Sequence, residues 1–147
     1  AEAIAVNLRE SFNISVPIIS IVVGEGGSGG ALGIGIGNRI LILEHAYYSV
    51  ISPEGCAAIL WKDRAFSDQA AAALKITGKD LIDLELADEI IQEPIGGAHS
   101  NKTEAAKFVK SAILKHLKEL KFLTSDAIKS DRYKKFRQMG RFDGEIN

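Results

Sequence analysis

The chain has 147 residues, of which 46% are hydrophobic, and its formal net charge is −1. That length suits one domain, and abundant aliphatic residues at low net charge exclude an intrinsically disordered chain. A single cysteine, Cys56, excludes a disulfide within the chain and a zinc site built from thiolates. Proline, glycine and charges interrupt every apolar run, so we expect no membrane span.

Charge is divided unevenly along the chain. Residues 1–101 carry 6 basic and 13 acidic side chains, whereas residues 102–147 carry 12 basic and 6 acidic side chains. A basic C-terminal third suits phosphates, nucleic acid or an acidic partner. Because the lysines are spaced rather than massed, we favour solvated faces of amphipathic helices that serve subunit contact and solubility.

The predicted elements begin with a helix over residues 1–12, whose apolar side chains lie mostly on one side. The chain starts without methionine or a helix cap, which we interpret as the middle of a helix in a processed, truncated or fragmentary chain. Pro17 then enforces an extended backbone. Residues 18–23 (IISIVV) are apolar almost throughout, which predicts a strand buried on both faces, as in parallel sheets.

A glycine-rich turn, residues 24–30 (GEGGSGG), follows that strand and precedes a short predicted helix at residues 31–36. Eight of the 14 glycines fall within residues 24–37, which indicates close packing or close approach of a ligand. Two further apolar strands are predicted over residues 39–43 and 46–51.

The second half begins with a strong helix start, in which Ser52 is the N-cap, Pro53 the first helical residue and Glu54 part of the first turn. That helix should end near Trp61. The later predicted elements are helices at residues 67–75, 79–84, 103–122 and 125–139, and a strand at 89–92. Alternating strands and helices predict an α/β fold.

The turn over residues 24–30 is the strongest candidate for chemistry. Glycines allow consecutive backbone amides to point one way, and the N-terminus of the following helix adds partial positive charge. This arrangement binds nucleotide phosphates or dinucleotides, or stabilises an enolate or tetrahedral oxyanion. A phosphate loop is excluded, because Gly30 occupies the position where that motif requires lysine.

Two alternatives to an oxyanion site remain open. Gly24–Gly29 satisfies the dinucleotide pattern G-x-G-x-x-G, and Glu44 lies about 20 residues on, where a ribose-binding acid is expected. Gly26, Ser28 and Gly30 satisfy the nucleophile pattern G-x-S-x-G. The available histidines are His45, His99 and His116, of which His99 is the best site candidate and His116 is expected in the core.

Long stretches of the chain resemble one known family. They are VPIISIVVGEGGSGGALGIGIGNRILILEHAYYSVISPEGCAAILWK, LADEIIQEPIGGAH and the ending RYKKFRQMGRF. They are similar to the carboxyltransferase alpha subunit of the multi-subunit acetyl-CoA carboxylase of bacteria and plastids, in its C-terminal portion. The resemblance implies a crotonase-like (ClpP/crotonase) α/β fold of β-β-α units. Residues 1–101 would be the C-terminal part of that domain, and residues 102–147 its helical segment.

The resemblance also implies the activity and the partners. The family moves the carboxyl group of carboxybiotin, held on a biotin carboxyl carrier protein, to acetyl-CoA, and forms malonyl-CoA for fatty acid synthesis. We therefore expect an alpha2beta2 hetero-oligomer that is active only with a zinc-ribbon beta subunit. No metal in this chain, no membrane and no nucleic acid are expected. The expected location is a bacterial cytoplasm or a plastid stroma.

Site residues follow from the same resemblance. Gly29 and Gly30 would donate backbone hydrogen bonds to the biotin ureido oxygen, which gains negative charge as the carboxyl group leaves. The biotin pocket would include Gly26, Gly27, Ser52, Glu54 and Gly55. The alternatives are another crotonase-type acyl-CoA enzyme, such as a hydratase or decarboxylase, or a nucleotide-binding module that uses Gly24–Gly29.

Overall fold

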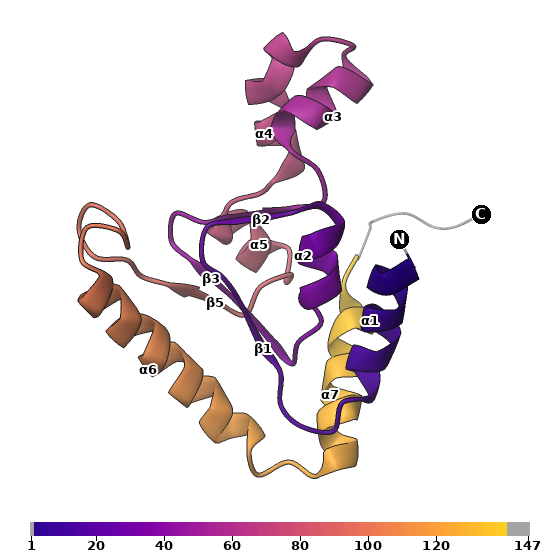
Figure 1. The fold of residues 1–147 in the computed structure, drawn as a ribbon, viewed down its shortest axis with the longest axis vertical. Coiled ribbons are helices and arrows are strands. Elements are labelled where there is room, and N and C mark those ends of the chain that lie inside the picture. The colour runs from indigo at the N-terminus through magenta and orange to yellow at the C-terminus, as the bar shows by residue number, and fades with distance from the viewer. Residues whose placement is uncertain (1, 141–147) are drawn as a thin grey trace.

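The structure is a computed structural model that describes residues 2–140, and it alternates strands and helices as predicted (Figure 1). The strands are β1 (Ile19–Val22), β2 (Glu25–Gly27), β3 (Arg39–Leu43), β4 (Tyr47–Ser49) and β5 (Glu89–Ile91). The helices are α1 (Glu2–Asn13), α2 (Ser28–Ile34), α3 (Pro53–Leu60), the 3-10 turn η1 (Arg64–Phe66), α4 (Ser67–Leu74), α5 (Gly78–Asp83), α6 (Lys102–Leu120) and α7 (Ser125–Gln138). Arg141 and Phe142 of the RYKKFRQMGRF motif lie outside the described residues.

The strands form two small parallel sheets. The first has the order β1-β3-β5, with Ile21 beside Leu41 and Leu41 beside Glu89. The second pairs β2 with β4, so that Gly26 lies beside Tyr48. Every pairing within these two sheets is parallel, as expected for crossover connections that contain helices.

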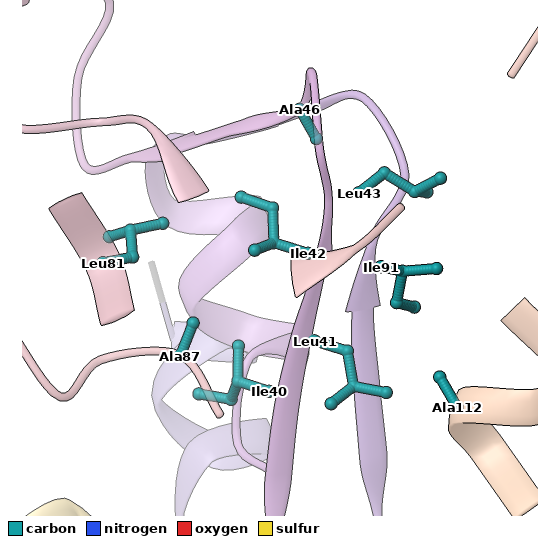
Figure 2. Close-up of a cluster of buried hydrophobic side chains, with 9 residues drawn as sticks. All are labelled: Ile40, Leu41, Ile42, Leu43, Ala46, Leu81, Ala87, Ile91 and Ala112. Carbon is teal, nitrogen blue, oxygen red and sulfur yellow. The ribbon is translucent and has the colours of Figure 1, made fainter. Parts of the chain in front are cut away.

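The core forms around β3, the central strand of the first sheet. Its side chains alternate: Leu41 extends toward Ala112 of α6, and Ile42 extends toward Leu81 of α5 on the other face (Figure 2). Both faces are therefore covered, which explains why residues 40–43 form an unbroken apolar run. Helix α6 thus contributes to the same core as the strands.

Two expectations about the first strands are wrong. All four residues of β1 are only half-buried, because β1 is at the edge of its sheet and only β3 has a neighbour on each side. The predicted turn over residues 24–30 is instead a strand, β2, followed directly by α2, which starts at Ser28. The reason is non-local: β2 finds a pairing partner in β4, which local glycine content does not reveal.

Helices α3 and α4, joined by η1, project from the rest of the molecule (Figure 1). The predicted start of α3 is confirmed: the Ser52 hydroxyl accepts a hydrogen bond from the Gly55 N–H at 3.1 Å, with Pro53 as the first residue. Cys56 is buried in a small cluster, against which the half-buried Trp61 packs. Cys56 is therefore a packing residue, as its small apolar side chain suggests.

Helix α7 is anchored by one fully buried guanidinium, that of Arg132. This group donates hydrogen bonds to the carbonyls of Ser11 (2.7 Å), Ile14 (2.8 Å) and Val16 (2.9 Å), and to the Asn38 side chain (2.8 Å). The expectation of a solvated basic face is thus wrong for Arg132. Burial lowers the pKa of this guanidinium, with the nearby Asp131 acting in the opposite direction. Within residues 2–140, no helix is both long and apolar enough to cross a membrane.

Candidate functional site

A groove of about 710 Å³ lies between β1, β2 and α2. The backbone of Gly26, Gly27 and Gly30 lines one side of it, and the half-buried side chains of β1 line the other. Sequence reasoning placed these glycines at one site together with Gly29, which is not part of the groove lining: a Cβ added to Gly29 would point at Ile4 of α1.

The glycines of this region lack side chains for different reasons. A Cβ on Gly26 would lie 2.7 Å from the Tyr48 ring, and one on Gly37 would lie 2.8 Å from the Arg39 carbonyl oxygen, so packing requires both glycines. A Cβ on Gly29 would meet only the mobile end of the Ile4 side chain, at 2.9 Å. A Cβ on Gly30 would meet no atom within 4 Å.

Backbone conformation does not explain Gly30 either. Among the described residues, the glycines with positive φ are Gly96, Gly97 and Gly140, all distant in sequence from α2. Gly30 is moreover inside a helix, where alanine is more favourable by about 1 kcal/mol. Neither packing within the described residues nor backbone conformation therefore accounts for a glycine at this position.

The first N–H groups of α2 also lack a side-chain cap. Its N-cap is Gly27, in extended conformation (φ −138°, ψ 154°), which has no side chain to accept from them. Four other helices do have a capping side chain: Ser52, Thr77, Asn101 and Thr124. Helix α4 has none, but it continues directly from η1. The start of α2 thus presents backbone donors beside the groove.

Sequence reasoning did not connect three polar side chains that influence one another in the structure, those of Glu25, Tyr47 and Glu54. The parallel register places Glu25 beside Tyr47. The pKa of the Tyr47 hydroxyl is raised above its ordinary value. Burial is the largest cause, followed by the charge and the hydrogen bond of Glu25 and then by the charge of Glu54. Only strand pairing brings Glu25 and Tyr47 together, since they are 22 positions apart in the sequence.

The remaining predicted pocket residues lie at the start of α3. Ser52 and Gly55 form its cap, and a Cβ on Gly55 would approach the Ile51 side chain to 3.0 Å, so this glycine serves packing. Neither Ser52, Glu54 nor Gly55 is part of the groove lining. The charge of Glu54 contributes to the raised pKa of Tyr47, which is itself outside the groove lining.

The histidines do not complete a nucleophile site at Ser28. Ser28 does have the positive φ (58°) of a tight strand-to-helix turn. However, His116 is buried with its Nε2 2.7 Å from Glu89, as expected of a core histidine, and His45 lies 3.4 Å from Glu93. His99 is exposed in the loop beside Gly97. Across residues 2–140, no hydrogen bond joins Ser28 to a histidine.

The dinucleotide reading also fails on geometry. Its glycines would have to form a loop around a pyrophosphate, whereas Glu25–Gly27 is a strand paired to β4. The Glu44 carboxylate accepts a hydrogen bond from the Glu93 N–H at 3.1 Å, so it is engaged in holding that loop. In the described part of the chain, no three acidic, histidine or cysteine residues gather as a metal site would require.

Comparison with known proteins agrees with the family resemblance of the sequence. Residues 1–140 match the family model "Acetyl co-enzyme A carboxylase carboxyltransferase-like". Acetyl-coenzyme A carboxylase carboxyl transferase subunit alpha of Synechococcus elongatus is 57% identical over 96% of this chain and 43% of that protein. The same subunit of Thermosynechococcus vestitus is 58% identical over 96% of this chain and 44% of its own length. The chain thus spans less than half the length of these relatives.

Solved structures agree on the fold. A Pseudomonas malonate decarboxylase hetero-tetramer in complex with coenzyme A superposes with a TM-score of 0.67 at 18% identity, over 88% of this chain and 50% of that one. Transcarboxylase 12S superposes with a TM-score of 0.57 at 15% identity, over 98% of this chain and 24% of that one. The fold is the predicted crotonase-like α/β fold. By its match over residues 1–140, the chain belongs to the acetyl co-enzyme A carboxylase carboxyltransferase-like family.

Proposed function

We propose that this chain acts in the carboxyltransferase reaction of acetyl-CoA carboxylase, and that the N–H groups of Gly29 and Gly30 hold an oxygen that becomes negative during the reaction. The observation that carries the proposal is Gly30, which faces the groove although neither packing nor backbone conformation requires glycine there. Relatives that share more than half of its residues are named as carboxyl transferase subunits.

The chemistry needs donors fixed in place before charge develops. Carboxybiotin, on its carrier protein, would supply the carboxyl group that converts acetyl-CoA to malonyl-CoA. The two consecutive amides at the start of α2 would stabilise the oxygen that gains charge as this group departs. Because they are backbone groups of a helix, they need no reorganisation, and each such donor typically contributes ~2.7–4 kcal/mol to lowering the barrier.

The residues around these amides suit a neutral ring system rather than a phosphate. The groove is lined mainly by glycine backbone and by Ile and Val side chains, with Ser20, Glu25 and Tyr48 as its polar side chains, and no lysine or arginine is part of its lining. Gly26 and Gly27 would form its floor. Ser52, Glu54 and Gly55 lie outside the groove lining, and their place at its border follows from the family resemblance.

Partners belong to the same proposal. The matched relatives are named subunit alpha, which supports a complex with a beta subunit. The alpha2beta2 stoichiometry and the zinc ribbon of the partner follow from the family resemblance. A biotin carrier protein would deliver the carboxyl group. Cyanobacterial and other relatives favour a bacterial cytoplasm or a plastid stroma. Another acyl-CoA enzyme of this fold is supported less, because malonate decarboxylase is only 18% identical.

The test uses the assembled carboxyltransferase and measures malonyl-CoA formation from acetyl-CoA and carboxybiotin. Gly30→Val fills the open space beside the groove, and we expect the turnover number to fall about 100-fold, as for loss of one oxyanion donor. Gly33→Val in the same helix is the matched control, since a Cβ at Gly33 makes only ordinary contacts with Ile4 (3.7 Å) and lies outside the groove lining. Wild-type turnover by Gly30→Val would exclude the proposed site. Malonyl-CoA formation by this chain alone would exclude a site shared with a partner.

A further inference from the structure

Helix α2 is held against β2 and β4 by one aromatic side chain, Tyr48. Its ring lies over Gly26 of the neighbouring strand, where an added Cβ would come within 2.7 Å of Cδ2. Its hydroxyl lies against Gly35, just after α2, where an added Cβ would overlap the oxygen. Two glycines on separate elements therefore make room for the same side chain.

The hydroxyl of Tyr48 also completes the hydrogen bonding of α2. It donates to the Ala31 carbonyl at 3.2 Å. In a continuing α-helix the Gly35 N–H would bond to that carbonyl, but here it bonds to the Leu32 carbonyl at 3.3 Å. The Tyr48 hydroxyl thus replaces the missing helical donor, one residue after Gly30. Burial raises the pKa of this hydroxyl, so it stays protonated and able to donate.

We propose that Tyr48 is a positioning residue, which sets the place of the Gly29–Gly30 backbone relative to the groove by clamping α2 through the Ala31 carbonyl. This inference rests on the proposed function for its effect on catalysis. Tyr48 also lines the groove, with its ring between the sheet and the helix. Its strand is fixed in turn, because the Tyr48 N–H donates to the Ile76 carbonyl at 3.1 Å.

Tyr48→Phe keeps the ring and removes only the donor. In the assembled carboxyltransferase, we expect kcat to fall on the order of tenfold while KM for acetyl-CoA is unchanged. The fall in kcat is smaller than for removal of an oxyanion donor, because the donor is only displaced and still stabilises part of the developing charge. Hydrogen–deuterium exchange should speed up several-fold in the peptide covering residues 28–35 and stay unchanged in the core strand β3. Tyr133→Phe, at a tyrosine that is 59% exposed on α7, is the matched control.

The outcomes separate the two proposals. Wild-type kcat and wild-type exchange at residues 28–35 in Tyr48→Phe would overturn the positioning role, and so would faster exchange spread evenly over β3. If Tyr48→Phe does not fold, Gly35→Ala is the second variant, because its Cβ would overlap the Tyr48 hydroxyl and lie 2.9 Å from the Ala31 carbonyl oxygen, so the contact between these two groups cannot persist. Wild-type exchange at residues 28–35 and wild-type kcat in Gly35→Ala would then overturn the positioning role. If the wild-type assembly transfers no carboxyl group, the proposed function fails, whereas the exchange experiment still decides the role of Tyr48.

Discussion

Replacing Arg132 by methionine tests how α7 is held to the N-terminal part of the chain. Methionine keeps an unbranched side chain of similar length but donates no hydrogen bond. The carbonyls of Ile14 and Val16 would lose the donor that Arg132 provides. Ser11 and Asn38 each keep a second interaction, with the Ile14 N–H at 3.4 Å and the Ile18 N–H at 3.2 Å.

The expected loss follows from these counts. An unsatisfied carbonyl costs about 1–3 kcal/mol, and the lower value suits Ile14 and Val16 because both residues are exposed and water can replace the donor. Loss of the stronger, charge-assisted hydrogen bonds increases the expected destabilisation, whereas removal of a charge that was desolvated on folding reduces it. We expect Arg132→Met to lower the free energy of unfolding by about 2–4 kcal/mol, a large part of the roughly 5–15 kcal/mol typical of a domain.

Urea unfolding followed by far-UV circular dichroism measures this loss. Arg137→Met is the control, because Arg137 is exposed on the same helix and its replacement should change stability by no more than about 0.5 kcal/mol. The stability of Arg132→Lys should lie between those of the other two variants, since a lysine ammonium cannot reproduce the planar array of donors of the guanidinium. Equal stability of Arg132→Met and Arg137→Met would refute the reasoning.

Two further predictions concern an ion pair and a glycine. Burial alone would raise the pKa of Glu89, but hydrogen bonds from Lys115 and His116 outweigh burial and lower it, so the folded carboxyl binds its proton less tightly than the unfolded one. Glu89 therefore stabilises the fold above its unfolded pKa of about 4.3, and this stability is lost as the pH falls through its lower folded pKa. Glu89→Gln should reduce the free energy of unfolding at about pH 7 and flatten the decline of that free energy below about pH 5. An unchanged pH profile of the free energy of unfolding in urea would contradict this. Gly26→Ala should lower the free energy of unfolding by about 1–3 kcal/mol because the added methyl group meets the Tyr48 ring, whereas Gly30→Ala should cost nothing. Thermal unfolding compares the two variants directly, and equal losses of stability would show that both glycines serve packing.

The sequence alone identified the features that depend on neighbouring residues. The apolar run at residues 40–43 of β3, the Ser52-Pro53 start of α3 and the long helix predicted over residues 103–122 are local signals, and the structure confirms each of them. The glycines at residues 26–30 were placed at one site because they are adjacent in the chain. The family resemblance likewise rests on contiguous motifs, and the family match confirms it.

Only the tertiary structure decided the features that depend on distant residues. Residues 25–27 form a strand because β4 is available as a partner, and Arg132 is buried because carbonyls more than 115 positions away converge on it. The glycines themselves divide in the same way: Gly26 is required by Tyr48, whereas Gly30 faces open space. Periodicity along a chain reports which face of an element is apolar, but it does not report what that face meets. For that physical reason, sequence found the glycine segment, and packing separated Gly26, which the Tyr48 ring requires, from Gly30, which faces the groove.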